Sequence, residues 1–383
     1  MSLEHFALVD STLREGEQFS HANFSTADKK EIARALSGFG IEYIELTSPC
    51  ASSGSRKDCE TIAMMGLPST ILTHIRCRRD DAKMAIETGV DGVSFFLKPA
   101  AFSDPSPVDW ERQDFLEPVL EILGYTREQA PDIEIRFSLE DVFRAPLEQV
   151  FRLYQRVEQS GFVDRLGIAD TVGIALPSQV EDMVRLFRSI SGRQIEFHGH
   201  NDTECAVANS YTALKAGATH IDTSVLGLGE RNGITSLAGF IARMYSLQKE
   251  LIKDKYRLER LKPLHELVAR KVGLPIPWNH PVVGEAAFVH KAGTHTNSIL
   301  KDPTSYEILD PEDFSALRTI LIAHKLTGWH SIKARAQKLG LCIDEQKIKA
   351  LSSRIKQAAD EETLTMKQLD DFLISGLQAE GKG

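Results

Sequence analysis

The sequence predicts an α/β fold, a (β/α)8 TIM barrel followed by a small linker subdomain and a C-terminal helical region. Two observations predict the barrel. Through roughly the first 250 residues, short runs rich in β-branched and aromatic residues alternate with longer amphipathic stretches, which is the rhythm of βα units around a parallel sheet. The short runs number about eight, the strand count of a closed barrel. An open doubly wound sheet would show the same alternation, so the strand count is what favours the barrel.

Each predicted strand is a short apolar run bounded by polar or turn-forming residues. The runs lie near Phe6 to Val9, Ile41 to Leu46, Thr70 to His74, Gly92 to Leu97, Ile133 to Ser138, Arg165 to Ala169, Ile195 to His198 and His220 to Val225. Between them, stretches such as Thr26 to Phe39 repeat apolar residues at helical spacing and predict the helices outside the barrel.

The barrel domain is expected to span residues 1–273, because a proline-rich segment follows it. Leu274 to Pro281 contains Pro275, Pro277 and Pro281, which interrupt helical structure. We assign 274–330 to a linker or lid subdomain. Residues 331–383 contain helical patterns such as Asp344 to Ala358 with charged outer faces, and are assigned to a C-terminal helical region.

Composition places the chain among ordinary globular proteins, with 42% hydrophobic and 26% charged residues among 383. The formal net charge of −9 argues against nucleic acid as the main partner, since phosphate binding requires clustered Lys and Arg.

The five cysteines are scattered without C-x-x-C spacing, which argues against disulfides and favours a reducing compartment. No apolar run is long enough for a membrane helix, and no secretory leader is recognisable, so a cytoplasmic enzyme that needs no membrane is expected.

Polar residues at the ends of the predicted strands are the first candidates for a functional site, because the chemistry of such barrels occurs at the C-terminal strand ends. The strongest local pattern is Phe197-His198-Gly199-His200-Asn201-Asp202 after the seventh strand. Side chains two apart on a strand share a face, so His198 and His200 can point at one metal ion. An isolated H-x-H pair is more often a hydrogen-bonded pair at a polar rim, so other residues must support the metal site.

The run Asp10-Ser11-Thr12-Leu13-Arg14-Glu15-Gly16-Glu17-Gln18 follows the first strand and supplies that support. It brings a carboxylate and a guanidinium to a strand exit, where they can share a pocket with the histidines. Glu15 becomes a candidate third metal ligand, and Arg14 a fixed cation beside the metal. Taken alone, the same run could be an ordinary solvated loop.

The chain resembles the family of metal-dependent acyltransferases that contains the homocitrate and isopropylmalate synthases, and within it the homocitrate synthase branch. The resemblance rests on DSTLREGEQF, ELTSP, THIRC, IRFSLED, IADTVG, FHGHND and GLGERNGIT, and extends through AGTH to the helical tail. It implies a (β/α)8 barrel, an obligate homodimer and a divalent metal, for which Zn, Mn, Mg, Co and Fe are all candidates. It also implies a reaction between acetyl-CoA as co-substrate and a small anionic 2-oxo acid, 2-oxoglutarate, which would give homocitrate and CoA.

The resemblance also implies roles for individual residues. Glu15, His198 and His200 match the metal ligands, and Arg14 matches the arginine beside the reacting carbonyl oxygen. The positions that match acceptor-binding residues are Gln18, His74, Arg136, Ser138 and Thr171.

His295 and Tyr306 match the residues placed to remove a proton from the acetyl methyl group. They lie beyond the barrel, in a region that reaches the partner subunit in the family, so the partner chain is expected to complete the active site. Glu140 is a further candidate for proton handling. The loop Gly227-Leu228-Gly229-Glu230 could approach a CoA phosphate or could equally form a tight turn.

Ser94 departs from the family pattern, which has a carboxylate there in lysine-pathway members. Its presence puts inhibition by lysine in doubt and leaves room for another acceptor, such as phosphonopyruvate, which would give 2-phosphonomethylmalate, or oxaloacetate.

A lyase of the 3-hydroxy-3-methylglutaryl-CoA type shares the barrel and the H-x-H pair, but the long C-terminal part and His295 argue against it. A non-catalytic barrel would require a lost ligand or base, and none of the matched residues is lost.

Overall fold

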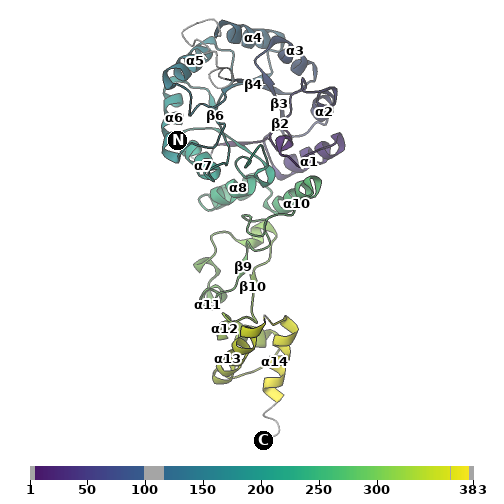
Figure 1. The fold of residues 1–383 in the computed structure, drawn as a ribbon, viewed down its shortest axis with the longest axis vertical. Helices are drawn as coiled ribbons and strands as arrows, with labels where there is room; N and C mark the ends of the chain where they lie inside the picture. Colours follow the sequence, from purple (N-terminus) through teal and green to yellow (C-terminus); the bar gives the residue numbers. More distant parts are fainter. Residues whose placement is uncertain (1–4, 99–115, 363, 379–383) are drawn as a thin grey trace. The chain divides into compact units, whose positions relative to one another are not determined.

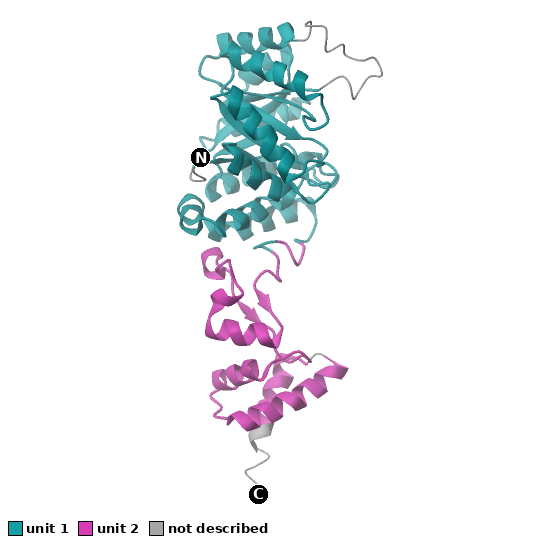
Figure 2. Cartoon of the chain, turned by 90° about the vertical axis from the view of Figure 1, so that its left-hand side faces the viewer, with its two compact units in different colours: residues 1–276, 281–283 teal, residues 277–280, 284–383 magenta. Residues whose placement is uncertain are grey.

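The computed structural model describes residues 5–98, 116–362 and 364–378. The chain divides into two compact units, which Figure 2 distinguishes by colour. The first comprises Met1–Ile276 with Pro281–Val283, and the second comprises Pro277–His280 with Gly284–Gly383. The segments assigned from sequence to a linker subdomain and a helical region both fall largely in the second unit.

A closed barrel of parallel strands forms the centre of the first unit and confirms the predicted (β/α)8 fold (Figure 1). Neighbouring strands pair in chain order, and the last strand returns to pair with the first. The strands are β1 (Ala7–Asp10), β2 (Tyr43–Leu46), β3 (Thr70–Arg76), β4 (Gly92–Leu97), β5 (Glu134–Leu139), β6 (Arg165–Asp170), β7 (Gln194–Gly199) and β8 (His220–Thr223).

Helices surround this barrel (Figure 1). They are α1 (Thr26–Phe39), α2 (Ser53–Ala63), α3 (Arg79–Glu87), α4 (Leu116–Gln129), α5 (Leu147–Ser160), α6 (Pro177–Ile190), α7 (Ala206–Ala216), α8 (Leu237–Tyr245), α9 (Lys249–Lys255) and α10 (Leu261–Val272). Short 3-10 turns lie at η1 (Gly16–Gln18), η4 (Val225–Gly227) and η5 (Leu258–Arg260). None of the helices that the structure describes is both long and apolar enough to cross a membrane.

Side chains alternate along the barrel strands between the outer helical layer and the barrel interior. On β5, Ile135 and Phe137 are fully buried, and the Phe137 ring packs edge to face with Tyr154 of α5, at 5.8 Å between centroids. Arg136 and Ser138 point the opposite way, because side chains alternate along a strand. The Tyr154 hydroxyl accepts a hydrogen bond from Leu139 N (2.7 Å) and donates one to Gly167 O (2.6 Å), which ties β5 to β6. The inner residues of these strands are therefore held by a well-packed outer layer.

The second unit has a small core of its own. Its elements are β9 (Val289–His290), α11 (Gly293–Lys301), η6 (Pro303–Ser305), η7 (Pro311–Phe314), β10 (Thr319–Ile320), α12 (Trp329–Lys338), α13 (Glu345–Glu361) and α14 (Met366–Gln378). Strands β9 and β10 pair in parallel. Buried residues from α12, α13 and α14, including Ile332, Ile348 and Leu369, pack into one apolar cluster.

Candidate active site

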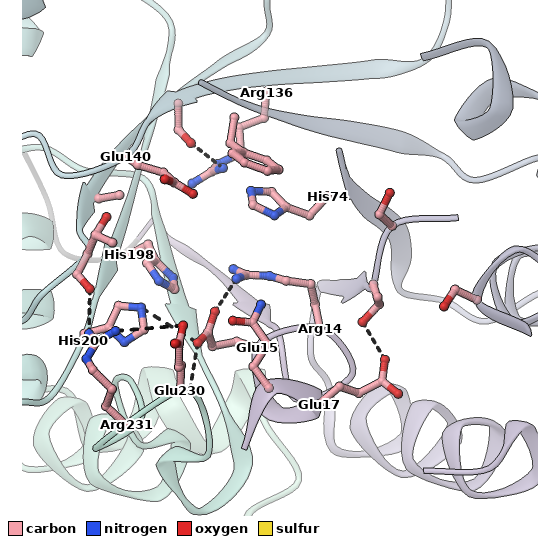
Figure 3. Close-up of a pocket in the computed structure, with 18 residues that line it drawn as sticks. Arg14, Glu15, Glu17, His74, Arg136, Glu140, His198, His200, Glu230 and Arg231 are labelled. Atoms are coloured by element: carbon pink, nitrogen blue, oxygen red, sulfur yellow. Dashed lines mark hydrogen bonds and ion pairs between the residues drawn. The ribbon is translucent and has the colours of Figure 1, made fainter. Parts of the chain in front are cut away.

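A pocket of about 500 Å³ opens at the C-terminal ends of the barrel strands (Figure 3). Its wall brings together residues from sequence segments that lie as much as about 200 positions apart. They are Arg14, Glu15, Glu17, Gln18, Thr47, Ser48, Ser55, His74, Phe96, Arg136, Ser138, Glu140, Ala169, Thr171, His198, His200, Glu230 and Arg231. Every barrel residue that the sequence singled out as catalytic, acceptor-binding or metal-ligating lines this pocket.

Glu15, His198 and His200 form the one cluster with metal-ligand geometry among the described residues. One potential ligand atom from each lies within 4.8 Å of the others, and all three side chains are buried. The two imidazoles come from β7 and the residue after it, with ring centroids 5.0 Å apart. Glu15 reaches them from the turn after β1, where its backbone N donates to Ser11 O at 2.7 Å, and its Oε1 lies 3.8 Å from His200 Nε2.

The protein holds the two imidazoles differently. His198 Nδ1 lies 2.5 Å from Asp222 Oδ2, and burial raises the pKa of Asp222 to about 7. When Asp222 is ionised, it accepts the Nδ1 proton and leaves His198 Nε2 with its lone pair for a ligand bond. His200 Nδ1 is buried and has no hydrogen-bond partner among the described residues. The nitrogen that faces Glu15 Oε1 is His200 Nε2, at 3.8 Å, and two imidazoles with one carboxylate are a donor set that fits a divalent metal ion.

Electrostatics favour the protonation states that a metal requires. Burial would raise the pKa of Glu15, but Arg14, the two neighbouring histidines and the Glu230 N–H together outweigh it and hold that pKa at about 2. Burial and the charge of Arg14 lower the pKa of His198 to about 4, and burial with the neighbouring His198 lowers the pKa of His200 to about 4. At neutral pH the cluster is thus one carboxylate and two neutral imidazoles, the forms that coordinate metals.

Arg14 is fixed by three carboxylates. Its Nε donates to Glu45 Oε2 at 2.7 Å, its Nη1 pairs with Glu15, and its Nη2 lies 3.4 Å from Asp222 Oδ2. Burial opposes the charged form of the guanidinium, but these carboxylates keep its pKa above the usual range. A permanent positive charge therefore stands beside the metal-ligand cluster (Figure 3).

The opposite side of the pocket is built from β3, β4 and β5. His74 stacks on Phe96, with ring centroids 4.5 Å apart and an interplanar angle of 21°. Burial and the charge of Arg14 lower the pKa of His74 to about 3, so this imidazole is neutral. Arg136 Nη1 donates to Ser138 Oγ at 3.1 Å. This side offers a cation, a hydroxyl and a neutral imidazole to a small anionic ligand.

His295 and Tyr306 belong to the second unit, where their rings stack with centroids 4.2 Å apart. His295 is exposed and Tyr306 is half exposed. The described lining of the pocket comes from the barrel unit, so these two residues are not among the side chains that the barrel itself brings together.

Several residues of the site were absent from the candidates drawn from the sequence. Asp222 fixes His198, and Gly229 lies against Glu15: a Cβ built at Gly229 would stand 2.9 Å from Glu15 Cγ. In the same loop, Glu230 N donates to Glu15 Oε1 at 3.0 Å. The sequence allowed two interpretations of this loop, a contact with a CoA phosphate or a tight turn. In the structure the loop packs against Glu15, a candidate metal ligand. Asp222 lies one residue before the end of β8, so the strand-end rule would have indicated it as a pocket candidate, though not as the partner of His198.

Two family models match the chain. The model described as HMGL-like matches residues 5–268, and the model described as homocitrate synthase post-HMGL domain-like matches residues 282–363.

Curated relatives are similar over nearly the whole chain. A mitochondrial homocitrate synthase from Penicillium rubens is 48% identical over 372 residues, covering 97% of this chain and 78% of the relative. The cytosolic isozyme of homocitrate synthase from Saccharomyces cerevisiae is also 48% identical, with 97% and 86% covered. A homocitrate synthase from Sulfurisphaera tokodaii is 35% identical over 91% of this chain and 75% of its own length.

Solved structures resemble the barrel. The HMG-CoA lyase from Bacillus subtilis superposes with a TM-score of 0.60 at 25% identity, covering 72% of this chain and 96% of the lyase. An HMG-CoA lyase from Acinetobacter baumannii, in complex with coenzyme A and 3-methylmalate, gives a TM-score of 0.60 at 19% identity, with 72% and 94% covered. At 19% identity the second likeness concerns the fold alone.

Proposed function

The chain belongs to the homocitrate synthase family of acyltransferases, and on that premise we propose that it condenses acetyl-CoA with 2-oxoglutarate to give homocitrate and CoA. The observation that carries the proposal is the cluster of Glu15, His198 and His200 beside the fixed charge of Arg14, at the mouth of the barrel. Such a site can bind a 2-oxo acid and activate its carbonyl group.

Glu15, His198 and His200 would hold the divalent ion. Two imidazoles and one carboxylate accept several such ions, Zn, Mn, Mg, Co and Fe among them. When bound, the ion supplies Lewis acidity at a carbonyl oxygen. The convergence of the three side chains and the neutral state of both imidazoles support this assignment.

In the proposed condensation, the methyl carbon of acetyl-CoA forms a bond to C2 of the acceptor. The methyl group gives a proton to a base, and the carbonyl oxygen of the acceptor becomes an alkoxide that then takes up a proton. Arg14 would stabilise the negative charge that develops on that oxygen, because its guanidinium is already oriented by Glu15, Glu45 and Asp222. Water then cleaves the thioester, which releases CoA and the tricarboxylate product.

The acceptor-binding roles follow the chemistry of the pocket wall. Arg136 and Ser138 would bind the distal carboxylate of 2-oxoglutarate, since guanidinium and hydroxyl groups both donate to carboxylates. Gln18, His74 and Thr171 would complete the contacts to the acceptor.

His295 and Tyr306 are proposed as the groups that remove the methyl proton, in a homodimer where each barrel is completed by the partner chain. Both residues are exposed on their own unit, and the same unit exposes large apolar side chains, including Ile308 at 77% and Leu317 at 86%. Glu140 lines the pocket, and burial raises its pKa toward the range useful for proton transfer.

The test is release of CoA from acetyl-CoA across a panel of acceptors: 2-oxoglutarate, phosphonopyruvate, oxaloacetate and 2-oxoisovalerate. We expect the highest kcat/KM with 2-oxoglutarate and no CoA release without an acceptor. Formation of acetyl-CoA from a 3-hydroxyacyl-CoA would indicate a lyase instead, and inactivity in both directions would indicate a binding protein.

One observation favours a shorter acceptor as a second candidate. The ring of Phe96 stacks on His74 and takes up space on the β3 and β4 side of the pocket, while Ser94 beneath it supplies no carboxylate. Phosphonopyruvate or oxaloacetate would need less room than 2-oxoglutarate, and a guanidinium pairs with a phosphonate as well as with a carboxylate. If Phe96 limits acceptor length, Phe96→Val should raise kcat/KM for 2-oxoglutarate relative to oxaloacetate.

For the cellular compartment we propose the cytosol, the location in the name of one Saccharomyces cerevisiae relative. Other relatives are named mitochondrial, so fractionation of the native cells with a compartment marker is the deciding experiment.

A further inference from the structure

We infer that Gly167 and Glu196 are positioning residues that together form a socket for the guanidinium of Arg136. The inference rests on the proposed function in one respect, that Arg136 binds the anionic end of the acceptor. Neither Gly167 nor Glu196 lines the pocket, so each would act through Arg136.

Arg136 is 5% exposed and emerges from β5 into the barrel. Its Nη1 donates to Ser138 Oγ at 3.1 Å, and its Nε lies 2.7 Å from Glu196 Oε1, an ion pair without hydrogen-bond alignment. Arginine has several rotatable bonds, and its side chain loses rotamer entropy when it is ordered. A partner on each side of the guanidinium reduces the number of orientations that remain.

Gly167 on β6 provides the space that the guanidinium occupies. A Cβ built at Gly167 would stand 2.6 Å from Arg136 Nη2, 2.7 Å from Arg136 Cζ and 2.7 Å from Ser138 Cβ. These separations are far below van der Waals contact, so any side chain at this position would displace the guanidinium, the more mobile of the two neighbours. The absence of a side chain at Gly167 is thus a condition for the observed orientation of Arg136.

Glu196 is itself held in place from the other side. Its Oε2 lies 3.1 Å from Arg165 Nη1, and Arg165 is fully buried, pairs with Glu134 and stacks over the Tyr43 ring at 4.5 Å. Glu196 divides its two oxygens between the guanidinium groups of Arg136 and Arg165, and with Glu134 the four side chains carry a formal charge of zero. Because Glu196 is shared, it orients Arg136 without serving as the counterion of Arg136 alone.

A purely structural role makes a different prediction. A buried ion pair that served only to fill the barrel would, when altered, lower stability and leave acceptor binding unchanged in the protein that still folds. A positioning role shows itself in the Michaelis constant for the acceptor, with the constant for acetyl-CoA unchanged. This effect on the Michaelis constant also depends on the presence of the side chain being positioned, and a double-mutant cycle measures that dependence.

The experiment compares Gly167→Ala, Glu196→Gln, Arg136→Ala and the double variant Gly167→Ala with Arg136→Ala. Gly167→Ala and Glu196→Gln should each raise KM for the acceptor by about tenfold or more, the effect of a misplaced charged hydrogen bond, with KM for acetyl-CoA changed by less than about twofold. In the Arg136→Ala background, Gly167→Ala should have a clearly smaller effect on acceptor KM, and what remains comes from the new Cβ against Ser138 Cβ. Gly239→Ala is the matched control: Gly239 is buried in α8, and an added Cβ would crowd Val207 Cγ2 at 3.1 Å.

An unchanged acceptor KM in both Gly167→Ala and Glu196→Gln would overturn the socket, as would an equal effect of Gly167→Ala with and without Arg136. If Gly167→Ala does not fold, Glu196→Gln alone decides, because it keeps the shape of the side chain and removes only the charge. If Arg136→Ala itself leaves acceptor KM unchanged, the proposed acceptor role of Arg136 fails, which is a separate result from failure of its positioning.

Discussion

The imidazole of His74 shows how the protonation state of one residue shapes the pocket. Burial, together with the charge of Arg14, lowers its pKa from the ordinary value of 6.5 to about 3. A neutral imidazole can donate or accept a hydrogen bond but adds no positive charge, so the attraction for an anionic acceptor comes from the arginines that line the pocket, Arg14, Arg136 and Arg231.

This state of His74 gives a prediction about pH. A histidine with an ordinary pKa would lose its charge as the pH rises through 6.5, and KM for the acceptor would rise with it. Because the pKa of His74 is depressed, its charge is already absent above about pH 4, and we expect acceptor KM to stay flat between pH 6 and 7.5. The measurement is KM for 2-oxoglutarate across that range. A rise with a midpoint near 6.5 that is lost in His74→Gln would contradict the prediction.

Asp222 is expected to matter through His198. The ionised carboxylate accepts the Nδ1 proton of His198, with 2.5 Å between Nδ1 and Oδ2, and so keeps Nε2 available as a ligand atom. Removal of such a partner typically costs about 10 to 100-fold in metal affinity, and we expect Asp222→Asn to fall in that range. Asp81→Asn is the control, because Asp81 is a buried carboxylate that pairs with Arg76, and neither residue lines the pocket. Competition with a chelator measures the metal affinity of both variants. Equal metal affinities in the two variants would refute the role of Asp222.

The sequence allowed us to predict site residues that repeat along one strand, but not the residues of other strands that contact them. His198 and His200 could be predicted as a pair because two-residue spacing on a strand puts them on one face. The contact of His198 with Asp222 joins the neighbouring strands β7 and β8, and that of Arg136 with Glu196 joins β5 to β7 across the barrel interior, so both contacts depend on the register of the strands. A single sequence contains no statement of that register, so these partners became visible only in the folded barrel.

Among the elements, the β8 to α8 loop contributes most directly to the metal-ligand cluster. In this loop Gly229 packs against Glu15, and the backbone N–H of Glu230 donates a hydrogen bond to Glu15 Oε1. The loop thus fixes the one candidate ligand that does not lie on β7 or at its end.

Gly229→Ala should therefore weaken metal binding. The new Cβ would stand 2.9 Å from Glu15 Cγ and 3.1 Å from Glu15 Oε1, so the carboxylate would have to move. Displacements of about 1 Å at such sites can cost on the order of 10²-fold in activity, and we expect a loss of at least about tenfold in metal affinity. Gly192→Ala is the control, since nothing lies within 4 Å of its added Cβ. Metal affinity equal to that of the control would show that the loop does not position Glu15.

The elements themselves were largely predictable, because strands and helices follow local periodicity. Each predicted strand overlaps an observed one, but the ends differ: the third continues past His74 to Arg76, and the eighth ends at Thr223 rather than Val225. Strand ends are set by hydrogen bonds to neighbouring strands, as with Arg76, which is in register with Phe96. The closed barrel was favoured by strand count, and its closure depends on the pairing of β1 with β8, more than 200 residues apart in sequence.

For the whole molecule, the proposed active site depends on two chains. The barrel unit holds the pocket, while His295 and Tyr306 lie on the other unit and are exposed there. In a homodimer, two chains with different defects can therefore form one intact site between them.

Mixing inactive chains tests this arrangement. Arg14→Gln removes the fixed cation of the barrel, and His295→Ala removes the proposed base, so each variant alone should be nearly inactive. Coexpression should restore about a quarter of the wild-type activity, because random pairing makes half of the dimers mixed and each mixed dimer has one intact site of two. Coexpression of two differently tagged Arg14→Gln chains is the control. No recovery in mixed dimers isolated through both tags would contradict a shared site.

The central claim, that Glu15, His198 and His200 hold a divalent ion required for condensation, is tested most directly by titrating chelator-treated protein with a divalent ion while following CoA release with 2-oxoglutarate. We predict no release before the titration, recovery that saturates at one ion per chain, and no saturable recovery in Glu15→Gln or His200→Gln. Full activity in the metal-free protein, or unchanged ion binding in both variants, would contradict the account.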